Sequence, residues 1–234
     1  MLRKESGTGK FIMGNETHWE KLYADTKHQS IWPWSDLVTL VMRHVLPQYS
    51  QTLEVLELGC GAGANIPFFQ SLNANYFGVD ISTTAIEQLH VRFPELKHSI
   101  TTADFCRDLP FSGPFDLVVD RGSLTHNESE SIRNCLESLK KRTHSNSMLV
   151  GIHWLSTESA HYNYGEPTVD PYCRTNFTSG RFAGVGIVHF ASESHLRDIL
   201  KEYEIISLQH VVIENREPSD YSKVAYWNFV ARRH

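Results

Sequence analysis

Apolar residues along the chain gather in two kinds of stretch, short continuous runs and longer segments with helical spacing. Short runs of apolar and β-branched residues, bounded by glycine or aspartate, are typical of buried strands. They predict strands at 53–58, 76–80, 115–120, 147–152, 205–213 and 224–230. Apolar side chains three and four positions apart predict helices at 14–27, 36–46, 64–72, 84–91, 128–141 and 192–201. Strands and helices therefore alternate, which predicts an α/β fold with a doubly wound sheet.

Several residues are expected to set the ends of these helices. Pro47 follows the 36–46 segment and is expected to stop that helix, because proline lacks the N–H that a helix interior needs. Ser82 and Thr83 are well placed to cap the 84–91 helix, and Ser192 the last one. The 64–72 helix is expected to point its N-terminal N–H groups at a ligand in the preceding turn.

The most informative stretch joins the first predicted strand to a glycine-rich turn. The residues from Val55 to Gly63 read VLELGCGAG, and a second run, YFGVD, ends at Asp80. Gly59, Gly61 and Gly63 have no Cβ, so the backbone can adopt positive φ and a ligand can approach closely. A carboxylate at the carboxyl end of the second strand can accept hydrogen bonds from both hydroxyls of a ribose. These features predict a nucleoside-binding βαβ unit.

The spacing of the glycines bears on which nucleoside binds. The dinucleotide fingerprint is G-x-G-x-x-G, whereas this turn is G-x-G-x-G and follows Glu57. An acid beside the turn suits a ligand with a cationic or amino end and suits a pyrophosphate poorly. The spacing therefore disfavours NAD-dependent oxidoreduction, and an ordinary tight turn without a ligand stays the alternative interpretation.

The motif ELGCGAG resembles the first motif of the class I S-adenosylmethionine-dependent methyltransferases, and further landmarks follow in the order of that family. The resemblance covers residues 53–154 by motif order and the rest of the chain more loosely. It implies a Rossmann-like, doubly wound, mostly parallel seven-stranded sheet with helices on both faces, N-terminal lid helices and an insertion after the fifth strand. The implied cofactor is S-adenosyl-L-methionine. The implied cofactor-binding residues are Glu57, Gly59, Gly61, Gly63, Asp80, Ile81, Asp104, Phe105 and Asp120.

The resemblance also implies separate tasks for these landmarks. Asp80 matches the acid that binds the ribose, and Asp104 matches the acid after the third strand that meets the adenine amino group. Phe105 matches the neighbour that lies against the adenine ring. The run FDLVVD, which ends at Asp120, matches the fourth strand, which opens onto the methyl donor and the acceptor.

One methyltransferase domain is expected to occupy residues 1–234. Its predicted parts are a mobile tail at 1–14, N-terminal lid helices at 15–49, a donor-binding core at 53–154, an acceptor-recognition insertion at 155–190, and a closing helix and strands at 191–234. The insertion departs from the regular alternation and is rich in aromatic and polar residues. It follows the carboxyl end of a strand, where open α/β sheets bind their ligands.

Candidate acceptor-binding residues come from three places, the region before the first strand, the end of the fourth strand and the insertion. Arginines suit a carboxylate or a phosphate because the guanidinium can bind both oxygens at once. Aromatic side chains are candidates for a lid or a stacking surface, with plain packing as the alternative. The substrate-binding candidates are Trp34, Arg121, Tyr162, Tyr164, Arg174 and Arg181.

Catalysis of methyl transfer needs alignment above all, and a base where the acceptor is a hydroxyl. His126 is the first candidate for that base, because an imidazole titrates near neutrality. Asp120 and His153 lie at the ends of the fourth and fifth strands and complete the catalytic candidates. The alternative for His126 is a packing role beside the donor. We expect no metal, because the chain lacks a ligand cluster like that of catechol-type enzymes.

Composition narrows the setting. The 234 residues carry a net charge of −5 and only short basic clusters, which argues against a large nucleic-acid footprint. No apolar run approaches the ~20 residues that span a membrane, and the N-terminus has no signal-peptide pattern. The four scattered cysteines favour a reducing, cytoplasmic location. We therefore expect a small-molecule acceptor as partner, no membrane and no nucleic acid, and leave a homodimer open.

The sequence thus predicts an enzyme that transfers a methyl group from S-adenosylmethionine to oxygen or nitrogen of a small polar metabolite. A sugar, a nucleotide sugar or a related glycan precursor is the most specific candidate. Two alternatives stay open: methylation of a thiol, a metalloid or a small carboxylate, and a non-catalytic S-adenosylmethionine-binding partner subunit. The motif for methylating exocyclic amines of adenine or glutamine amides is absent, since Asp-Arg-Gly-Ser stands at 120–123.

Overall fold

The computed structural model of the chain describes residues 14–25, 30–217 and 223–234. The predicted mobile tail at 1–14 lies outside the described residues except for its last position, and it stays a prediction. Within the described ranges, no helix combines the length and the apolar character needed to cross a bilayer.

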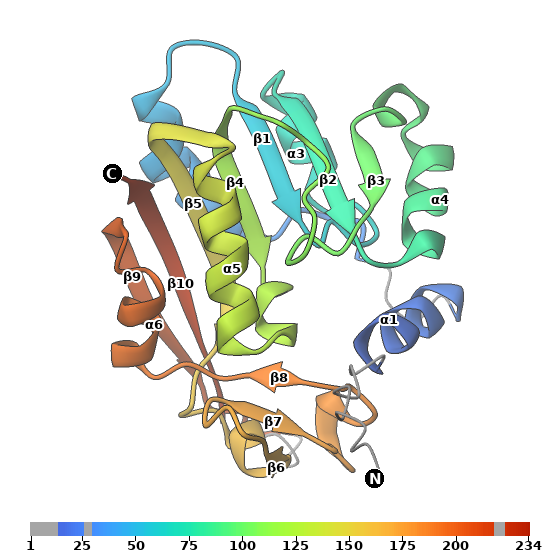
Figure 1. Cartoon of the computed structure of the whole chain (residues 1–234), viewed down its shortest axis with the longest axis vertical. Coiled ribbons are helices and arrows are strands. Elements are labelled where there is room, and N and C mark those ends of the chain that lie inside the picture. Colours follow the sequence, from blue (N-terminus) through green and yellow to red (C-terminus); the bar gives the residue numbers. More distant parts are fainter. Residues whose placement is uncertain (1–13, 26–29, 218–222) are drawn as a thin grey trace, which may run out of the picture.

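A seven-stranded mixed sheet forms the centre of the molecule (Figure 1). Its strand order is β3-β2-β1-β4-β5-β10-β9, and the pairs among the first five strands are parallel. The last two strands run antiparallel to their neighbours. The strands are β1 Glu54–Leu58, β2 Asn75–Asp80, β3 Ile100–Thr102, β4 Phe115–Arg121, β5 Thr143–Leu155, β9 Tyr203–Ile213 and β10 Val224–Arg233. The predicted Rossmann-like fold class is confirmed.

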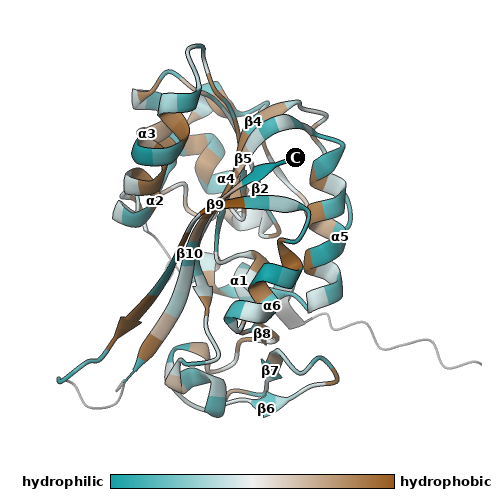
Figure 2. Cartoon of the chain, turned by 90° about the vertical axis from the view of Figure 1, so that its left-hand side faces the viewer, coloured by the Kyte–Doolittle hydropathy of each residue, from teal (hydrophilic) through white to brown (hydrophobic). Residues whose placement is uncertain are grey.

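Helices cover both faces of this sheet, as Figure 2 shows in a view along the sheet edge. The α-helices are α1 Gly14–Ala24, α2 Ser35–Leu40, α3 Ile66–Ser71, α4 Thr83–Arg92, α5 Ser129–Lys140 and α6 Glu193–Ile199. Strand β1 shows how the sequence produces two cores, because successive side chains of a strand face opposite sides. Leu56 and Leu58 pack in the cluster that contains α5 and α6 residues, whereas Val55 packs with those of α2, α3 and α4.

The segment before β1 differs from the predicted single helix. Helix α2 gives way to a π-helical turn, η1 (Val41–Val45), and then to a 3₁₀ turn, η2 (Leu46–Gln48). Pro47 therefore does not stop the helical path but lies in the first turn of η2, where the missing N–H has no partner to lose. The prediction that Pro47 ends the helical segment was wrong, because the segment continues through η2 to Gln48.

The predicted N-caps of α4 and α6 are confirmed, whereas the predicted first residue of α3 was wrong. Ser82 accepts a hydrogen bond from Ala85 N and caps α4, and Ser192 caps α6 by accepting from His195 N. Helix α3 begins at Ile66, two residues later than predicted, because residues 61–65 form turns between the strand and the helix. The N–H groups that face the turn therefore belong to this irregular segment as well as to α3.

The insertion at 155–190 has more regular structure than its sequence indicates. It contains the turns η5 (Ala160–Asn163) and η6 (Gly180–Phe182) and the short strands β6 (Glu166–Pro167), β7 (Cys173–Thr175) and β8 (Val188–His189). The three strands form a small antiparallel sheet. Its aromatic residues make a core of their own, centred on Phe177, Phe182 and Phe190. Figure 1 places this subdomain and α1 below the carboxyl ends of the parallel strands.

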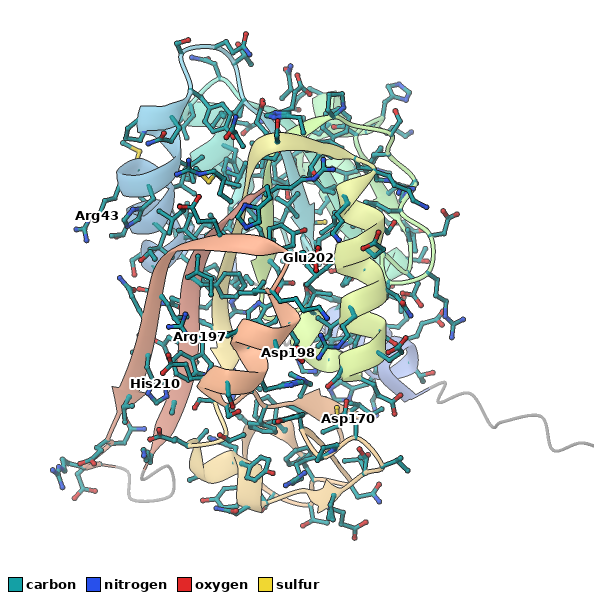
Figure 3. All side chains as sticks on the ribbon, turned by 60° about the vertical axis from the view of Figure 1, so that its left-hand side comes forward. Arg43, Asp170, Arg197, Asp198, Glu202 and His210 are labelled. Carbon is teal, nitrogen blue, oxygen red and sulfur yellow. The ribbon has the colours of Figure 1, made fainter. Side chains whose placement is uncertain are left out.

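The closing elements brace the insertion and α5. Strands β9 and β10 form a long ribbon whose far end projects from the body (Figure 2). On that ribbon His210 stacks on Trp227, with ring centroids 4.1 Å apart, and its Nε2 lies 3.0 Å from Ser156 Oγ at the start of the insertion. On α6, Asp198 pairs with Arg133 of α5; Asp198 and its neighbour Arg197 are labelled in Figure 3.

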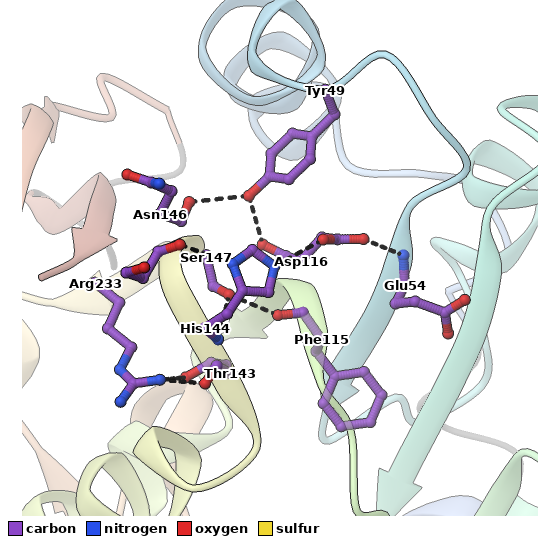
Figure 4. A network of polar contacts seen from close by, with 10 residues as sticks. Tyr49, Glu54, Phe115, Asp116, Thr143, His144, Asn146, Ser147 and Arg233 are labelled. Atoms are coloured by element: carbon purple, nitrogen blue, oxygen red, sulfur yellow. Dashed lines mark hydrogen bonds and ion pairs between the residues drawn. The ribbon is translucent and has the colours of Figure 1, made fainter.

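The amino ends of the central strands are held by a polar network (Figure 4). Asp116, at the start of β4, accepts from Glu54 N at 2.8 Å and contacts His144 Nε2 at 2.8 Å. Tyr49 Oη donates to the carbonyls of Asp116 and Asn146. This network holds the end of the sheet opposite the carboxyl ends of the parallel strands, where open α/β sheets bind their ligands.

Candidate active site

A cavity of about 1050 Å³ opens at the carboxyl ends of the parallel strands. Its wall combines the glycine turn after β1, the ends of β2 and β4, helix α1 and the insertion around η6. A volume of this size suits a nucleoside together with a second small molecule. The cavity therefore lies where the sequence placed the ligand, at the carboxyl edge of an open α/β sheet.

The glycine turn and Asp80 form one unit. Gly59, Gly61 and Gly63 all have positive φ, as expected. One carboxylate oxygen of Asp80 accepts from Gly61 N at 2.9 Å, and the other accepts from Ser82 N at 2.9 Å. Each oxygen keeps a second lone pair, so the carboxylate can still accept two hydroxyl hydrogen bonds from a ligand. Burial raises the pKa of Asp80, and these backbone donors oppose the rise.

The three glycines do not all face the cavity. Gly59 and Gly61 line it, whereas Gly63 lies outside its lining. A Cβ on Gly63 would stand 2.5 Å from the Leu89 side chain and 2.8 Å from that of Ile66, so this glycine permits close packing of the turn on the helices. The proposed contact of Gly63 with a cofactor thus gains no support from the geometry.

Helix α1 covers the glycine turn. Glu20 accepts from Ser82 Oγ at 2.7 Å and from Thr84 N at 3.2 Å, so its carboxylate caps the N-terminus of α4. Tyr23, three residues on, is almost fully buried, and its Oη is the first atom that a Cβ on Gly61 would meet, at 2.4 Å. These contacts of Glu20 and Tyr23 hold α1 against α4 and the glycine turn, next to Asp80.

Glu57 is a buried acid with two donors of its own. Asn65 Nδ2 donates to Oε1 at 2.7 Å, and Tyr76 Oη donates to Oε2 at 2.6 Å. Glu57 lines the cavity although only 2% of its surface is exposed. Burial raises the pKa of this carboxyl to about 7, and the two donors limit the rise. Glu57 can therefore change charge near neutral pH.

The end of the cavity beyond β2 is lined by Ile81, Asp104 and Phe105. Phe105 is buried, with 8% of its surface exposed. Asp104 accepts from Cys106 N at 3.1 Å and pairs with Arg107 at 3.2 Å. An acid next to a buried ring suits a flat heterocycle with an amino group, although Arg107 shares the carboxylate.

Asp120 lies behind the cavity wall and not on its surface. It is fully buried, and its carboxylate accepts from Ser123 Oγ, from Leu124 N at 3.0 Å and from Trp154 Nε1 at 2.6 Å. Burial raises its pKa to about 6, against these three donors. Both roles predicted for Asp120, in catalysis and in cofactor binding, lack a direct path to a ligand; its contacts instead fix the loop that follows β4.

That loop brings Arg121 into the cavity beside Trp34. The Arg121 guanidinium lies 3.7 Å from the centroid of the Trp34 ring, and both residues line the cavity. Arg181 of η6 also lines it, and its positive charge acts on Arg121. Three of the predicted substrate-binding residues, from three distant segments, thus meet in one part of the cavity.

Two histidines lie in the same region. His126 lines the cavity between Trp19 of α1 and Phe182 of the insertion, with ring centroids at 4.8 Å and 6.4 Å. His153 lines it as well, has a φ of 58° within β5, and its Nε2 lies 3.3 Å from Asp36 Oδ2. Burial and then the charge of Arg121 lower the pKa of His153 to about 4, so its ring is neutral at physiological pH.

The other three predicted substrate-binding residues lie outside the cavity lining. The Arg174 guanidinium lies 3.7 Å from the centroid of the Tyr162 ring and donates to the carbonyls of Pro171 and Cys173. Tyr164 packs against His161 within the insertion. These contacts stabilise the insertion, and the geometry offers no support for acceptor binding by the three. Among the described residues, no group of three or more His, Cys, Asp or Glu side chains is placed to hold a metal.

The sequence did not single out several residues that shape the site. Trp19 and Tyr23 of α1 line the cavity, which the helical spacing at 14–27 did not indicate. Asn65 and Tyr76 hold Glu57, and only one signal pointed to them: a buried carboxylate requires donors from its neighbours. Phe182 belongs to the core of the insertion and contacts His126. No spacing in the sequence brings these segments together.

Comparison with known proteins bears on what this cavity binds. Residues 55–146 match the family described as a methyltransferase domain. This segment contains most of β1, the glycine turn, Asp80, Asp104 and β4, in the order of the class I landmarks. Residues 55–146 are thus similar to a methyltransferase domain.

One curated relative matches about half of this chain. A magnesium-protoporphyrin O-methyltransferase from Rhodobacter capsulatus is 32% identical over 111 residues, which are 47% of this chain. The match spans about half of that relative's length, 50%.

Two solved structures share the fold of this chain. An S-adenosylmethionine-dependent methyltransferase from Methanosarcina mazei has a TM-score of 0.63 and 19% identity, over 81% of this chain and 97% of that chain. The 1,6-didemethyltoxoflavin-N1-methyltransferase from Burkholderia thailandensis, solved with S-adenosylhomocysteine, has a TM-score of 0.63 and 14% identity, over 100% and 93%. At these identities the likeness concerns the fold.

Proposed function

We propose that this chain transfers the methyl group of S-adenosylmethionine to an oxygen or nitrogen atom of a small polar metabolite. One observation carries the proposal: a single cavity joins the Asp80 glycine-turn unit to a polar wall that contains His126, Arg121 and Arg181. The first part suits a nucleoside and the second a polar acceptor. A sugar, a nucleotide sugar or a glycan precursor is the acceptor class that we favour.

The donor is proposed to lie along the glycine turn. The free lone pairs of Asp80 accept the two ribose hydroxyls, while its bonded lone pairs keep Gly61 and Ser82 in place. Phe105 covers one face of the adenine, and Asp104 accepts from its amino group. Glu57, ionised above about pH 7, balances the charge of the donor's ammonium group.

The reaction is an in-line displacement, and the bound sulfonium supplies an electrophilic methyl carbon. The acceptor atom forms a bond to that carbon while the carbon–sulfur bond breaks, and its electron pair stays on sulfur as a neutral thioether. The chain's residues orient the acceptor and exclude water. His126 accepts the proton that a hydroxyl acceptor releases.

The lid role predicted for residues 15–49 belongs to the same proposal. Glu20 and Tyr23 anchor α1 beside the donor site, and Trp19 of the same helix touches His126. A cytoplasmic setting is likewise retained, supported by four free cysteines, Cys60, Cys106, Cys135 and Cys173. A small-molecule acceptor is the partner that we propose, and a homodimer stays a prediction.

Calorimetry with S-adenosylhomocysteine, S-adenosylmethionine and NAD tests the donor. Micromolar affinity for both sulfur nucleosides, without binding of NAD, is the expected result. The complex then serves to screen acceptors for methyl transfer, beginning with sugar nucleotides. Binding of the sulfur nucleosides with no turnover on any polar acceptor would favour the non-catalytic partner subunit, and absence of their binding would refute the proposal.

Replacing His126 by glutamine is expected to slow turnover roughly 100-fold while S-adenosylhomocysteine affinity changes little, because a general base contributes about 10²–10⁴ in rate. Initial rates with the acceptor found in the screen give the first quantity and calorimetry the second. His98→Gln, at an exposed histidine, is the matched control. Equal rates for the His126 variant and wild type would assign this histidine to packing alone.

A further inference from the structure

Arg121 has an unusual environment for a charged side chain. It is mostly buried, and its Nε has no hydrogen-bond partner within the described part of the chain. Its contact is the face of the Trp34 ring, 3.7 Å from the guanidinium carbon. Stacking leaves the edge of the guanidinium, which carries the N–H donors, available to a ligand. A buried guanidinium normally pairs with a carboxylate or phosphate.

The acids around Arg121 are already occupied by other donors. Glu57 takes hydrogen bonds from Asn65 and Tyr76, as described above. Asp120 is satisfied by Ser123, Leu124 and Trp154. Asp36 accepts from Asn228 Nδ2 at 2.9 Å and contacts His153 Nε2 at 3.3 Å. No carboxylate in the described ranges forms an ion pair with Arg121.

The charge balance of this region also calls for an anion. Arg181 faces the same part of the cavity, and its charge, after burial, contributes to lowering the pKa of Arg121 to about 10. The methyl donor brings a sulfonium and an ammonium against one carboxylate, so it adds one net positive charge. Glu57 and Asp120 offset part of this positive charge, but neither pairs with Arg121, so an anion beside the two guanidiniums would still be favourable.

We propose that Arg121 and Arg181 bind an oxyanion of the methyl acceptor, a carboxylate or a phosphate. The inference rests on the proposed function and narrows its substrate class to acidic metabolites. Arg121 binds the oxyanion through the N–H groups at the edge of its guanidinium, while the Trp34 ring supports one face of that guanidinium. Trp34 is itself fixed, because its backbone N donates to Asn65 Oδ1 at 3.2 Å. The oxyanion then orients the acceptor near the methyl group.

Binding to the protein saturated with S-adenosylhomocysteine tests this proposal. The probes form pairs that differ in charge: glucuronate against glucose for the carboxylate, and glucose 6-phosphate against glucose for the phosphate. Comparison of UDP-glucuronate with UDP-glucose measures whether a carboxylate increases affinity when a diphosphate is already present. The anionic member of at least one pair is expected to bind roughly 10- to 100-fold more tightly, the range for hydrogen bonds to a buried charge.

Variants assign that preference to Arg121. Arg121→Gln is expected to remove the preference for the anionic probes. Arg121→Lys keeps the charge but not the planar guanidinium, and is expected to keep only part of that preference. Arg107→Gln is the matched control, since Arg107 also lines the cavity but is paired with Asp104. The control should keep the preference for the anionic probes. Thermal unfolding of each variant in complex with S-adenosylhomocysteine checks that the fold persists.

The outcomes separate this proposal from the proposed function. Equal or no binding of the anionic and neutral probes, with S-adenosylhomocysteine still bound, overturns the oxyanion site and leaves methyl transfer in place. Competition of the anionic probes with S-adenosylhomocysteine, together with loss of its affinity in Arg121→Gln, would assign Arg121 to the donor's own carboxylate and overturn the proposal too. Failure of S-adenosylhomocysteine to bind the wild type removes both.

Discussion

Replacing Asp80 by asparagine is expected to weaken S-adenosylhomocysteine binding at least about 100-fold. Both carboxylate oxygens already accept a backbone N–H, from Gly61 and Ser82. Asparagine puts an NH₂ group where one carboxylate oxygen stood. One backbone N–H then loses its acceptor, and one ribose hydroxyl loses a charged hydrogen-bond acceptor. Each hydrogen bond to a charged group contributes about 1.5–3 kcal/mol, and 1.4 kcal/mol corresponds to about tenfold in affinity. Calorimetry measures the loss directly.

Asp116→Asn is the matched control for this experiment. Asp116 is also a buried strand aspartate that accepts a backbone N–H, but it lies at the amino end of the sheet (Figure 4). Its replacement should lower the free energy of unfolding and leave ligand affinity unchanged. Asp80→Asn with wild-type affinity would contradict the nucleoside assignment, and equal losses in both variants would point to a general loss of folding.

The parts of the site that could be predicted are those that depend on neighbours in sequence. Positive φ at Gly59 and Gly61 follows from the missing Cβ, and the place of Asp80 follows from the length of one strand. A parallel sheet then brings the ends of successive strands to one edge, whatever the details of the loops. For that reason the donor end of the cavity was expected from motif order.

The acceptor end depends on contacts between segments that the sequence does not relate. Arg121 and Trp34 are 87 positions apart and meet because α2 packs across the sheet on β5 and β10. Within the insertion, the aromatic residues looked alike in sequence, yet Phe182 lines the cavity while Tyr162 lies under Arg174. Which side of a small sheet faces the ligand is decided by its packing, and composition carries no signal for it.

The stability of Glu57→Gln relative to the wild type is expected to rise by up to about 3 kcal/mol between pH 4.5 and pH 8. Burial raises the pKa of this carboxyl from 4.5 to about 7, and one unit corresponds to about 1.36 kcal/mol. Between these values the folded protein holds a proton that the unfolded chain has released, so the wild type loses stability as pH rises across this interval. The uncharged amide avoids that loss, although one of the two donors, Asn65 or Tyr76, loses its acceptor at every pH. The pH-dependent part of the difference should be absent below about pH 4.5 and complete above about pH 7.

Urea unfolding at pH 5 and pH 8 measures this difference, with Glu54→Gln, at the half-buried start of the same strand, as the matched control. The gain in stability is expected to come with weaker S-adenosylhomocysteine binding, since the amide cannot balance the ligand's ammonium group. Wild-type affinity should also rise as pH passes upward through about 7, and that rise should vanish in Glu57→Gln. Stabilisation without loss of S-adenosylhomocysteine affinity would show that the buried carboxylate contributes neither to stability nor to donor binding. Stabilisation together with loss of affinity would explain why a destabilising acid lies beside the glycine turn.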